Sequence, residues 1–230
     1  MSKSKNCISI KNCVIELVFD RPLGTFVKAK NLRGAIASAN RELVHFHHHT
    51  INGSLIYTYP LVQYKVIDGE AYIVGINEGA IELGKIDILN KSLKLGSDKE
   101  YVVQEQKIYF VNSNLGLYKE KIKYEFLSPW LALNERNYEE YQKLGSWAKR
   151  KILLEKILIG NIISMSKGLG YTVPGPIEAN ILKSKEVNTF LKANPMLGFL
   201  GEFEVNFEIP DYLGIGKSVS RGFGTVKKIR

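Results

Sequence analysis

Apolar and polar positions alternate near the start of the chain and then recur at a wider spacing. Over residues 13–19 every second residue is apolar, which is the period of a half-buried strand. Over residues 32–44 apolar residues recur every three or four positions, which predicts a helix. Asn31 comes directly before that run and is placed to cap the helix. The chain is therefore predicted to begin with a strand and a helix.

Two further apolar runs, residues 56–67 and 71–76, flank the dipeptide Asp68-Gly69. This dipeptide is preferred in the tight type I′ turn of a β-hairpin, so the two runs predict a hairpin. A short amphipathic stretch follows from residue 78 to about residue 89, and then a strand over residues 101–111 whose Gln/Lys-rich middle is typical of a bulge or turn. The predicted order of the first half is βαββαβ.

The second half repeats this kind of pattern. A strand over residues 121–126 precedes one or two helices over residues 134–167. Asn, Ser and Gly cluster at residues 113–117, where we place the boundary between two modules. We predict an α+β fold of two tandem ferredoxin-like, RRM-like βαββαβ domains, residues 1–115 and 116–230. The remaining strands are predicted over residues 179–183, 187–191, 199–207 and 225–229.

The amino-acid composition limits the class of binding partner and the cellular compartment that we expect. The 230 residues include 32 Lys and Arg and 23 Asp and Glu, a formal net charge of +9, which favours a polyanionic partner, nucleic acid first. The two cysteines, Cys7 and Cys13, provide neither a disulfide scaffold nor a cysteine-based zinc site, and they suit a reducing compartment. Residues 1–12 lack the pattern of a secretory signal, and no apolar run is long enough to span a membrane. We expect a soluble cytoplasmic protein.

The C-terminal tail is rich in glycine. Residues 214–224 contain four glycines, with Lys217 and Arg221 between them. A P-loop needs a glycine where this chain has Asp211, and a dinucleotide-binding loop needs a glycine where it has Val219. One interpretation is a loop whose backbone N–H groups and two cations hold a phosphodiester backbone. The other is an ordinary turn between strands.

All four histidines fall within residues 45–49. A metal site would use two alternating imidazoles, but the cluster contains no Cys or carboxylate to complete it. Acid/base chemistry suits the cluster better, because one imidazole can accept a proton near neutral pH while another donates one. In RNA cleavage a neutral His would deprotonate the attacking 2′-hydroxyl, and a protonated His or a tyrosine would assist the departing 5′-oxygen. A solvated polar loop is the remaining alternative.

Short motifs follow one another along nearly the whole chain in a specific order. Together they resemble the CRISPR-associated endoribonucleases that process precursor CRISPR RNA, in the repeat-associated mysterious protein superfamily, and most closely their archaeal-type subgroup. The order and spacing of the motifs carry this resemblance, because each motif alone is weak. The motifs are residues 32–36, the His-x-His of His47 and His49 preceded by Phe46, and residues 59–69, 75–79, 160–164, 167–170, 198–206 and 209–224.

The resemblance implies metal-independent cleavage within each CRISPR repeat, without a cofactor. The products would carry a 5′-hydroxyl and a 2′,3′-cyclic phosphate or its opened form. The His-x-His of the family matches His47 and His49, and the nearest match to its catalytic tyrosine is Tyr57. The alternatives to these assignments are His45, His48 and Tyr59.

The resemblance also implies that CRISPR repeat RNA lies between the two domains and against the glycine-rich loop. It leaves open whether the protein forms a homodimer or joins a CRISPR effector complex. Two other functions fit the residues: a non-catalytic RNA-binding subunit of such a complex with the same fold, and a general RNA-binding module unrelated to CRISPR. The expected RNA-binding residues are Gly214, Gly216, Lys217, Ser218, Ser220, Arg221, Gly222 and Gly224.

Overall fold

A computed structural model of the chain describes residues 6–39, 59–96 and 99–230. The chain divides into two compact units. The N-terminal unit comprises Ser9–Ser113 together with Val219–Gly222, and the C-terminal unit comprises Met1–Ile8, Asn114–Ser218 and Phe223–Arg230. Four residues of the glycine-rich tail therefore belong to a unit that is otherwise built from the first half of the sequence.

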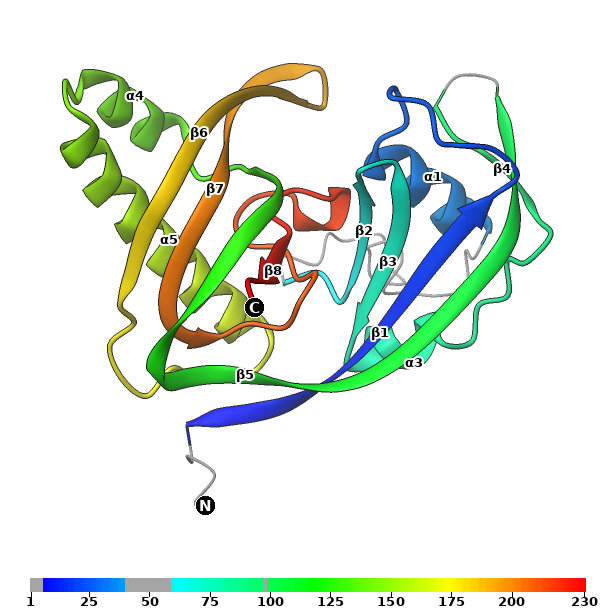
Figure 1. Ribbon diagram of the computed structural model, residues 1–230, viewed down its shortest axis with the longest axis horizontal. Helices are drawn as coiled ribbons and strands as arrows, with labels where there is room; N and C mark the ends of the chain where they lie inside the picture. The colour runs from blue at the N-terminus through cyan, green and yellow to red at the C-terminus, as the bar shows by residue number, and fades with distance from the viewer. Residues whose placement is uncertain (1–5, 40–58, 97–98) are drawn as a thin grey trace, which may run out of the picture. The chain divides into compact units, whose positions relative to one another are not determined.

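The N-terminal unit has the predicted βαββαβ order, with one additional short strand, β4, between α3 and β5 (Figure 1). Its strands lie in the order β2-β3-β1-β5. β3 pairs antiparallel with both β1 and β2. The elements are β1 (Cys7–Phe19), α1 (Ala29–Ala39), β2 (Val62–Ile67), β3 (Glu70–Ile76), α3 (Glu78–Leu83), β4 (Ser92–Lys94) and the first part of β5 (Glu100–Trp130).

The hairpin of β2 and β3 confirms the prediction made from Asp68-Gly69. The φ angles of these two residues are 51° and 85°, and a type I′ turn needs both to be positive. Strand pairing continues from this turn along both strands without a register shift. The turn therefore sets which side chains of β2 face the core.

Helix α1 begins at Ala29, three residues before the predicted start. The predicted capping role of Asn31 is wrong, because Asn31 lies inside the helix. Its Oδ1 instead accepts a hydrogen bond from the backbone N–H of Lys28, at 2.9 Å. A side chain at the third helical position thus satisfies the N–H of the residue before the helix, as in the reciprocal half of a capping box.

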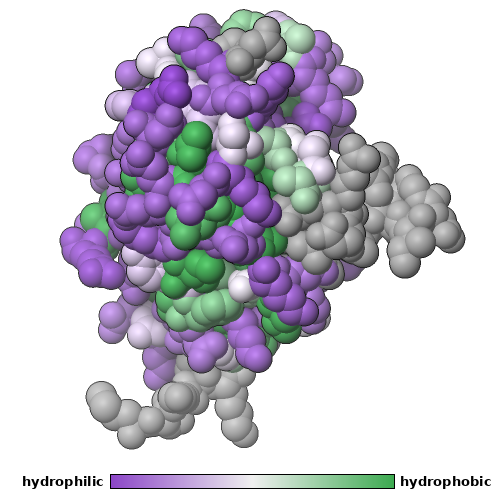
Figure 2. Space-filling model, turned by 90° about the vertical axis from the view of Figure 1, so that its right-hand side faces the viewer, coloured by the Kyte–Doolittle hydropathy of each residue, from purple (hydrophilic) through white to green (hydrophobic). Residues whose placement is uncertain are grey.

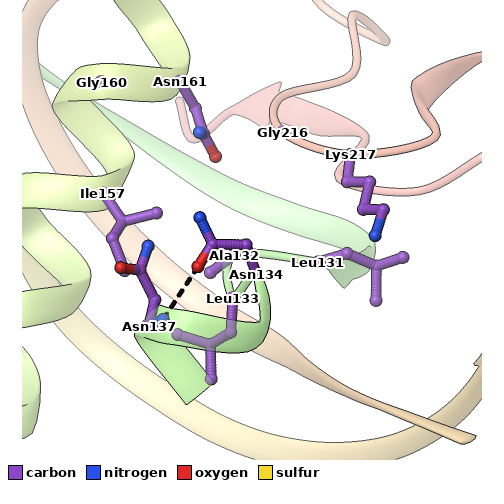
Figure 3. A pocket seen from close by; sticks show the side chains of 10 residues that line it. All are labelled: Leu131, Ala132, Leu133, Asn134, Asn137, Ile157, Gly160, Asn161, Gly216 and Lys217. Carbon is purple, nitrogen blue, oxygen red and sulfur yellow. Dashed lines mark hydrogen bonds between the residues drawn. The ribbon is translucent and has the colours of Figure 1, made fainter. Parts of the chain in front are cut away.

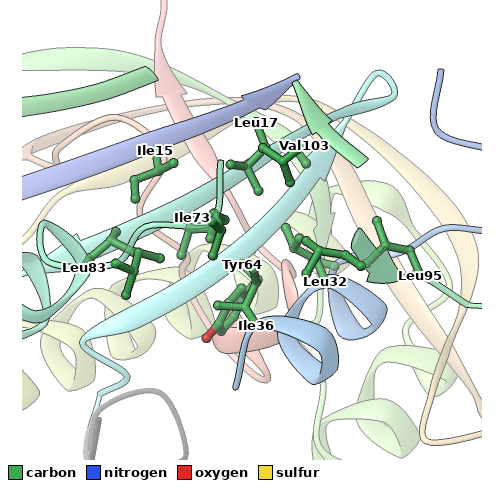
Figure 4. Packing of buried hydrophobic residues seen from close by; sticks show 14 of the residues in the cluster. Ile15, Leu17, Leu32, Ile36, Tyr64, Ile73, Leu83, Leu95 and Val103 are labelled. Carbon is green, nitrogen blue, oxygen red and sulfur yellow. The ribbon is translucent and has the colours of Figure 1, made fainter. Parts of the chain in front are cut away.

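The core of the N-terminal unit lies between the helices and one face of the sheet (Figure 4). Leu32 and Ile36 of α1 are fully buried against Tyr64 of β2, Ile15 of β1 and Ile73 of β3. Leu32 and Ile36 are four residues apart, so both lie on one face of the helix. The predicted helical spacing therefore identifies the buried face of α1 correctly.

The C-terminal unit contains two helices and an antiparallel sheet in which β5 lies between β8 and β7, with β6 beyond β7. The helical region predicted over residues 134–167 forms two separate helices. The strands predicted over residues 179–183 and 187–191 are one continuous strand. The elements are the last part of β5, α4 (Glu135–Lys143), α5 (Trp147–Gly168), β6 (Ala179–Leu191), β7 (Asn194–Glu208) and β8 (Val226–Lys228).

Residues 113–117, where we place the boundary between the two modules, form no separate linker, because they lie within β5. Leu115 and Leu117 are 0% and 9% exposed, and Gly116 between them is buried too, so this part of the strand is covered on both faces. Gly116 has a φ of 150° and a hypothetical Cβ there would lie 2.3 Å from the backbone oxygen of Asn6. The glycine therefore allows close packing inside a strand rather than a chain reversal.

Aromatic side chains fill the core of the C-terminal unit. Trp130 is 1% exposed, and its ring stacks on Phe126 with 5.2 Å between centroids. The indole Nε1–H of Trp130 donates to Oδ1 of Asn161 on α5, at 3.0 Å. A buried indole N–H needs such a partner, so this bond links α5 to the end of β5 and fixes the orientation of Asn161.

Large apolar side chains are also exposed, above all along β5. Phe110 is 66% exposed and Val111 is 52% exposed. Figure 2 shows apolar surface interrupted by polar surface on one face of the molecule. None of the helices in the described parts of the chain is both long and apolar enough to cross a membrane.

Candidate nucleic-acid interface

The predicted catalytic residues lie outside the described residues. His45, His47, His48, His49 and Tyr57 all belong to the segment 40–58. The alternative tyrosine, Tyr59, lies in the described part, half-buried and three residues before β2. The acid/base assignment therefore stays a prediction, and the described part of the candidate site is the glycine-rich tail with its surroundings.

The base of the glycine-rich tail is a narrow antiparallel pairing inside the C-terminal unit. Gly214 bridges Thr225, and the backbone N–H of Ile215 donates to the carbonyl of Gly224 at 2.8 Å. Gly224 has a φ of 62°, and a hypothetical Cβ there would lie 1.9 Å from the carbonyl oxygen of Ile215. Only glycine fits such a close approach of two backbones. The predicted residues Gly214 and Gly224 are thus buried at the base of the tail.

The tip of the tail is the three-residue 3₁₀ helix η1 (Val219–Arg221), which packs against β2 and α1 within the N-terminal unit. Gly222 follows with a φ of 88°, and a hypothetical Cβ there would lie 2.5 Å from Cβ of Ala29 at the start of α1. Glycine at this position therefore lets the tail lie directly on the first turn of α1. Ser220 and Arg221 remain partly exposed at this tip.

A buried lysine of β2 donates a hydrogen bond to η1 at the tip of the tail. Lys65 of β2 has no exposed surface, and its Nζ donates to Oε1 of Gln63 at 2.9 Å and to the carbonyl of Val219 at 3.4 Å. Gln63 in turn donates through Nε2 to the carbonyl of Pro60, at 3.1 Å. Burial lowers the pKa of Lys65 from its usual value near 10.5 to about 7. Lys65 thus joins β2 to η1 by polar contacts in the protein interior.

Two arginines influence one another electrostatically beside the same tip. Arg33 of α1 has a buried Nε atom with no hydrogen-bond partner among the described residues. Burial lowers the pKa of Arg33, and the positive charge of Arg221 lowers it further. An unpartnered donor on a partly buried cation, next to a second cation, is an arrangement that a bound anion would stabilise. The phosphate of a nucleic acid supplies such an anion.

The C-terminal unit holds a second feature, a cavity of about 410 Å³ (Figure 3). It lies between α4, α5 and the start of the glycine-rich tail, where Gly216 has a φ of 90°. A hypothetical Cβ at Gly216 would lie 2.8 Å from Nε1 of Trp130, so the glycine keeps this side open. The lining residues are Leu131, Ala132, Leu133, Asn134, Asn137, Ile157, Gly160, Asn161, Gly216 and Lys217.

The structure thus assigns the predicted tail residues to different surroundings. Gly216, the exposed Lys217 and the half-buried Ser218 lie in the C-terminal unit, whereas Ser220, Arg221 and Gly222 lie in the N-terminal unit. The described residues contain no cluster of His, Cys, Asp and Glu that could hold a metal ion.

Sequence reasoning missed Arg33 and Lys65 as members of this site. Lys65 carried a detectable signal, because a lysine in the middle of an apolar strand run is rarely buried without a specific role. Arg33 carried none, since it occupies an ordinary position within a helical pattern. Its proximity to Arg221 depends on a contact between residues 188 positions apart in the chain.

The sequence and structure of the chain are similar to those of known proteins. Two family models match consecutive parts of the chain: the Cas6b N-terminal domain matches residues 9–114 and the Cas6b C-terminal domain matches residues 116–229. A relative in the curated proteins, an uncharacterized protein of Methanocaldococcus jannaschii, is 46% identical over 148 residues, which is 64% of this chain and 99% of the relative.

Two solved structures are similar over the whole fold. A crystal structure of Cas6b is 36% identical, with a TM-score of 0.87, and covers 96% of this chain and 100% of its own. A crystal structure of the CRISPR RNA processing endoribonuclease Cas6b is 34% identical, with a TM-score of 0.77 and the same coverage. These similarities confirm the predicted tandem ferredoxin-like fold and the predicted family.

Proposed function

The chain belongs to the Cas6b family, and we propose that it binds CRISPR repeat RNA and cleaves precursor CRISPR RNA once within each repeat. One of its solved relatives is described as a CRISPR RNA processing endoribonuclease. The family membership supports an endoribonuclease role. The details of chemistry and recognition below are our proposal for this chain.

The observation that carries the binding part of the proposal is the pair of arginines beside η1. Arg33 has a buried donor without a partner among the described residues, and Arg221 adds a second positive charge. Two guanidinium groups and the backbone of a glycine-rich segment suit the bidentate recognition of phosphate oxygens. We therefore assign one phosphodiester of the RNA to this place.

The proposed cleavage uses the RNA as its own nucleophile. A neutral imidazole, His47 or His49, accepts the proton of the 2′-hydroxyl, and the freed oxygen attacks the neighbouring phosphorus. The bond from phosphorus to the 5′-oxygen breaks, and the second histidine, as imidazolium, or Tyr57 donates a proton to that oxygen. The ends are then a 2′,3′-cyclic phosphate and a 5′-hydroxyl. The balance of this step needs neither metal ion nor added cofactor.

The experiment that tests the proposal uses a transcript with several CRISPR repeats, incubated with the protein in EDTA. We expect one cut per repeat, and no cut in a repeat whose scissile nucleotide carries a 2′-deoxy sugar, although that RNA still binds. Cleavage of the deoxy RNA would mean that an activated water, and not the 2′-hydroxyl of the RNA, is the nucleophile. Binding without cleavage of the normal RNA would favour the non-catalytic subunit of an effector complex.

The assignment of roles to the histidines has its own test. Alanine at His47 or His49 is expected to lower the single-turnover rate by about 10²–10⁴, the usual contribution of a positioned acid or base. RNA affinity should change little. His45→Ala is the matched control, because it removes an imidazole from the same cluster. If His45→Ala lowers the single-turnover rate strongly and His49→Ala hardly does, the catalytic pair is His45 and His47 instead.

A further inference from the structure

The cavity of the C-terminal unit is lined by side-chain amides in fixed orientations. Oδ1 of Asn161 accepts from Nε1–H of Trp130 at 3.0 Å, and Oδ1 of Asn134 accepts from the backbone N–H of Asn137 at 2.8 Å. Since both oxygens are engaged, the two Nδ2 groups are the atoms that can donate to a ligand. In Figure 3, Asn134 and Asn161 point toward one another across the cavity.

Apolar and cationic groups complete the lining. Ile157 of α5 and Leu131 and Leu133 after β5 supply apolar walls, and the exposed Lys217 lies across from α5 (Figure 3). A volume of about 410 Å³ lies within the range of small-ligand pockets. Aliphatic walls, a few convergent hydrogen-bond donors and one cation suit a nucleobase with its attached phosphate.

We infer that this cavity binds a single unpaired nucleobase of the repeat RNA, with Lys217 at the adjoining phosphate. The inference rests on the proposed function, because the RNA is the source of the base. Sequence-specific RNA recognition commonly uses such unstacked bases, read on their hydrogen-bonding edges. The cavity thus acts as a specificity site in this proposal.

The chemistry of the lining favours some bases over others. The two oriented amides and Lys217 are all donors, so they match a base edge that carries two acceptors. Guanine has such an edge in O6 and N7, whereas adenine replaces the first acceptor with an amino donor. At the bound position, guanine is therefore preferred to adenine, a purine of the same size.

Gly160 on α5 offers a way to fill the cavity without harming the fold. A hypothetical Cβ at Gly160 meets no atom within 4 Å, and the residue lies inside a helix, where glycine is a poor choice. Gly160→Leu is therefore expected to fold with a melting temperature at least that of the wild type. Gly160→Ala is the matched control, because it improves the helix equally but adds only one methyl group.

Binding is measured with a single-stranded repeat RNA that carries a 2′-deoxy sugar at the scissile nucleotide, so that it stays intact. A series of such RNAs has one base removed at each position in turn. In the wild type and Gly160→Ala, removal of one particular base is expected to weaken binding by about tenfold. In Gly160→Leu, the intact RNA should bind about tenfold more weakly, and the same base removal should cost nothing more.

A second pair of variants tests the donor chemistry. Asn134→Asp keeps the N-cap of α4, because aspartate caps as well as asparagine, but loses the Nδ2 donor. Ser146→Asp adds the same charge at the N-cap of α5, which is not part of the lining. We expect Asn134→Asp to lose the preference for guanine over adenine at the bound position and Ser146→Asp to keep it.

The outcomes separate the two proposals. If Gly160→Leu binds every RNA of the series as the wild type does, the nucleobase site is wrong, while specific cleavage by the same variant would leave the proposed function intact. If guanosine monophosphate alone saturates the cavity while RNA binding is unaffected by Gly160→Leu, the cavity serves a free nucleotide and the inference fails. A wild-type protein that neither binds nor cuts repeat RNA would overturn the proposed function itself.

Discussion

The segments that lead from the third strand to the fourth differ between the two units. In the N-terminal unit this segment contains helix α3, whose Ala80 and Leu83 are buried in the core. Between β7 and β8 of the C-terminal unit the corresponding segment is residues 209–225, which are all described. It contains four glycines and the short η1, and η1 packs within the N-terminal unit. A helix satisfies its own backbone and adds apolar surface to the core, whereas the glycine-rich segment allows two backbones to approach closely, as Gly224 approaches Ile215. The same position in two related sheets thus serves packing in one, and in the other it carries the proposed RNA contact.

The glycines of the two segments illustrate this difference. Gly84 ends α3 with an ordinary φ of −68°, and a hypothetical Cβ there would meet the outer end of the exposed Phe110 ring. Gly224 has a φ of 62°, and the atom that its Cβ would meet is a backbone oxygen. A side chain can move away, but a paired backbone cannot, so only the second glycine is structurally demanding.

The largest expected effect comes from Gly224→Ala. The left-handed backbone and the clash with the Ile215 carbonyl should together lower the free energy of unfolding by about 2–5 kcal/mol. Gly84→Ala should change it by less than about 0.5 kcal/mol. Urea unfolding of both variants checks the comparison. Equal effects at the two positions would mean that the tail relaxes as easily as a surface side chain.

The second prediction concerns the pH dependence of stability and Lys65. In the folded state burial lowers the pKa of Lys65 to about 7, while the unfolded chain keeps the usual value near 10.5. Between these pH values only the unfolded state binds the proton, so the free energy of unfolding should rise with pH across this window. Below about pH 7 the full cost of burying the charge is present.

Lys65→Met removes this titration and keeps an unbranched side chain of similar length. The variant should be more stable than the wild type at pH 6, by about 1–4 kcal/mol, and the difference should shrink as pH rises toward 10.5. Thermal or urea unfolding over this pH range is the measurement. A wild-type stability that stays flat from pH 7 to 10.5 would show that Lys65 remains charged, held by Gln63 and the Val219 carbonyl.

Much of the fold was predictable because its signals are local. The alternation in β1, the helical spacing of Leu32 and Ile36, and the Asp68-Gly69 turn each depend on a few neighbouring residues, and the structure confirms them. The cluster of Asn, Ser and Gly at residues 113–117 did not reveal that the chain continues there as one long strand, because Leu115 and Leu117 are buried within β5.

The candidate site was predictable only in part. The glycines and cations of the tail stand out in the sequence, but their division between two units does not, because it arises from packing against β2 and α1. The partners of the tail, Arg33 and Lys65, come from elements far away in the chain. The asparagines of the cavity come from α5 and from the start of α4, so no sequence motif brings them together.

The smallest expected effect is that of Lys217→Ala. Lys217 is exposed, and a single phosphate contact contributes through counterion release, so the slope of log affinity against log salt should fall by about one. Protein stability should not change. Fluorescence anisotropy with repeat RNA at several salt concentrations measures the slope. An unchanged slope would remove Lys217 from the RNA-binding surface.

The central claim is that the tip of the glycine-rich tail holds an RNA phosphate between Arg33 and Arg221. Its most direct test measures the RNA affinity of the double variant Arg33→Ala/Arg221→Ala at several salt concentrations. The double variant should bind repeat RNA more weakly, and the slope of log affinity against log salt should fall by about two. The control Lys91→Ala/Lys94→Ala removes two exposed cations from the same unit and should change neither the affinity nor the slope. Unfolding should show that the arginine variant is as stable as the wild type, because two like charges are removed together. Wild-type affinity and slope in the arginine variant would contradict the claim.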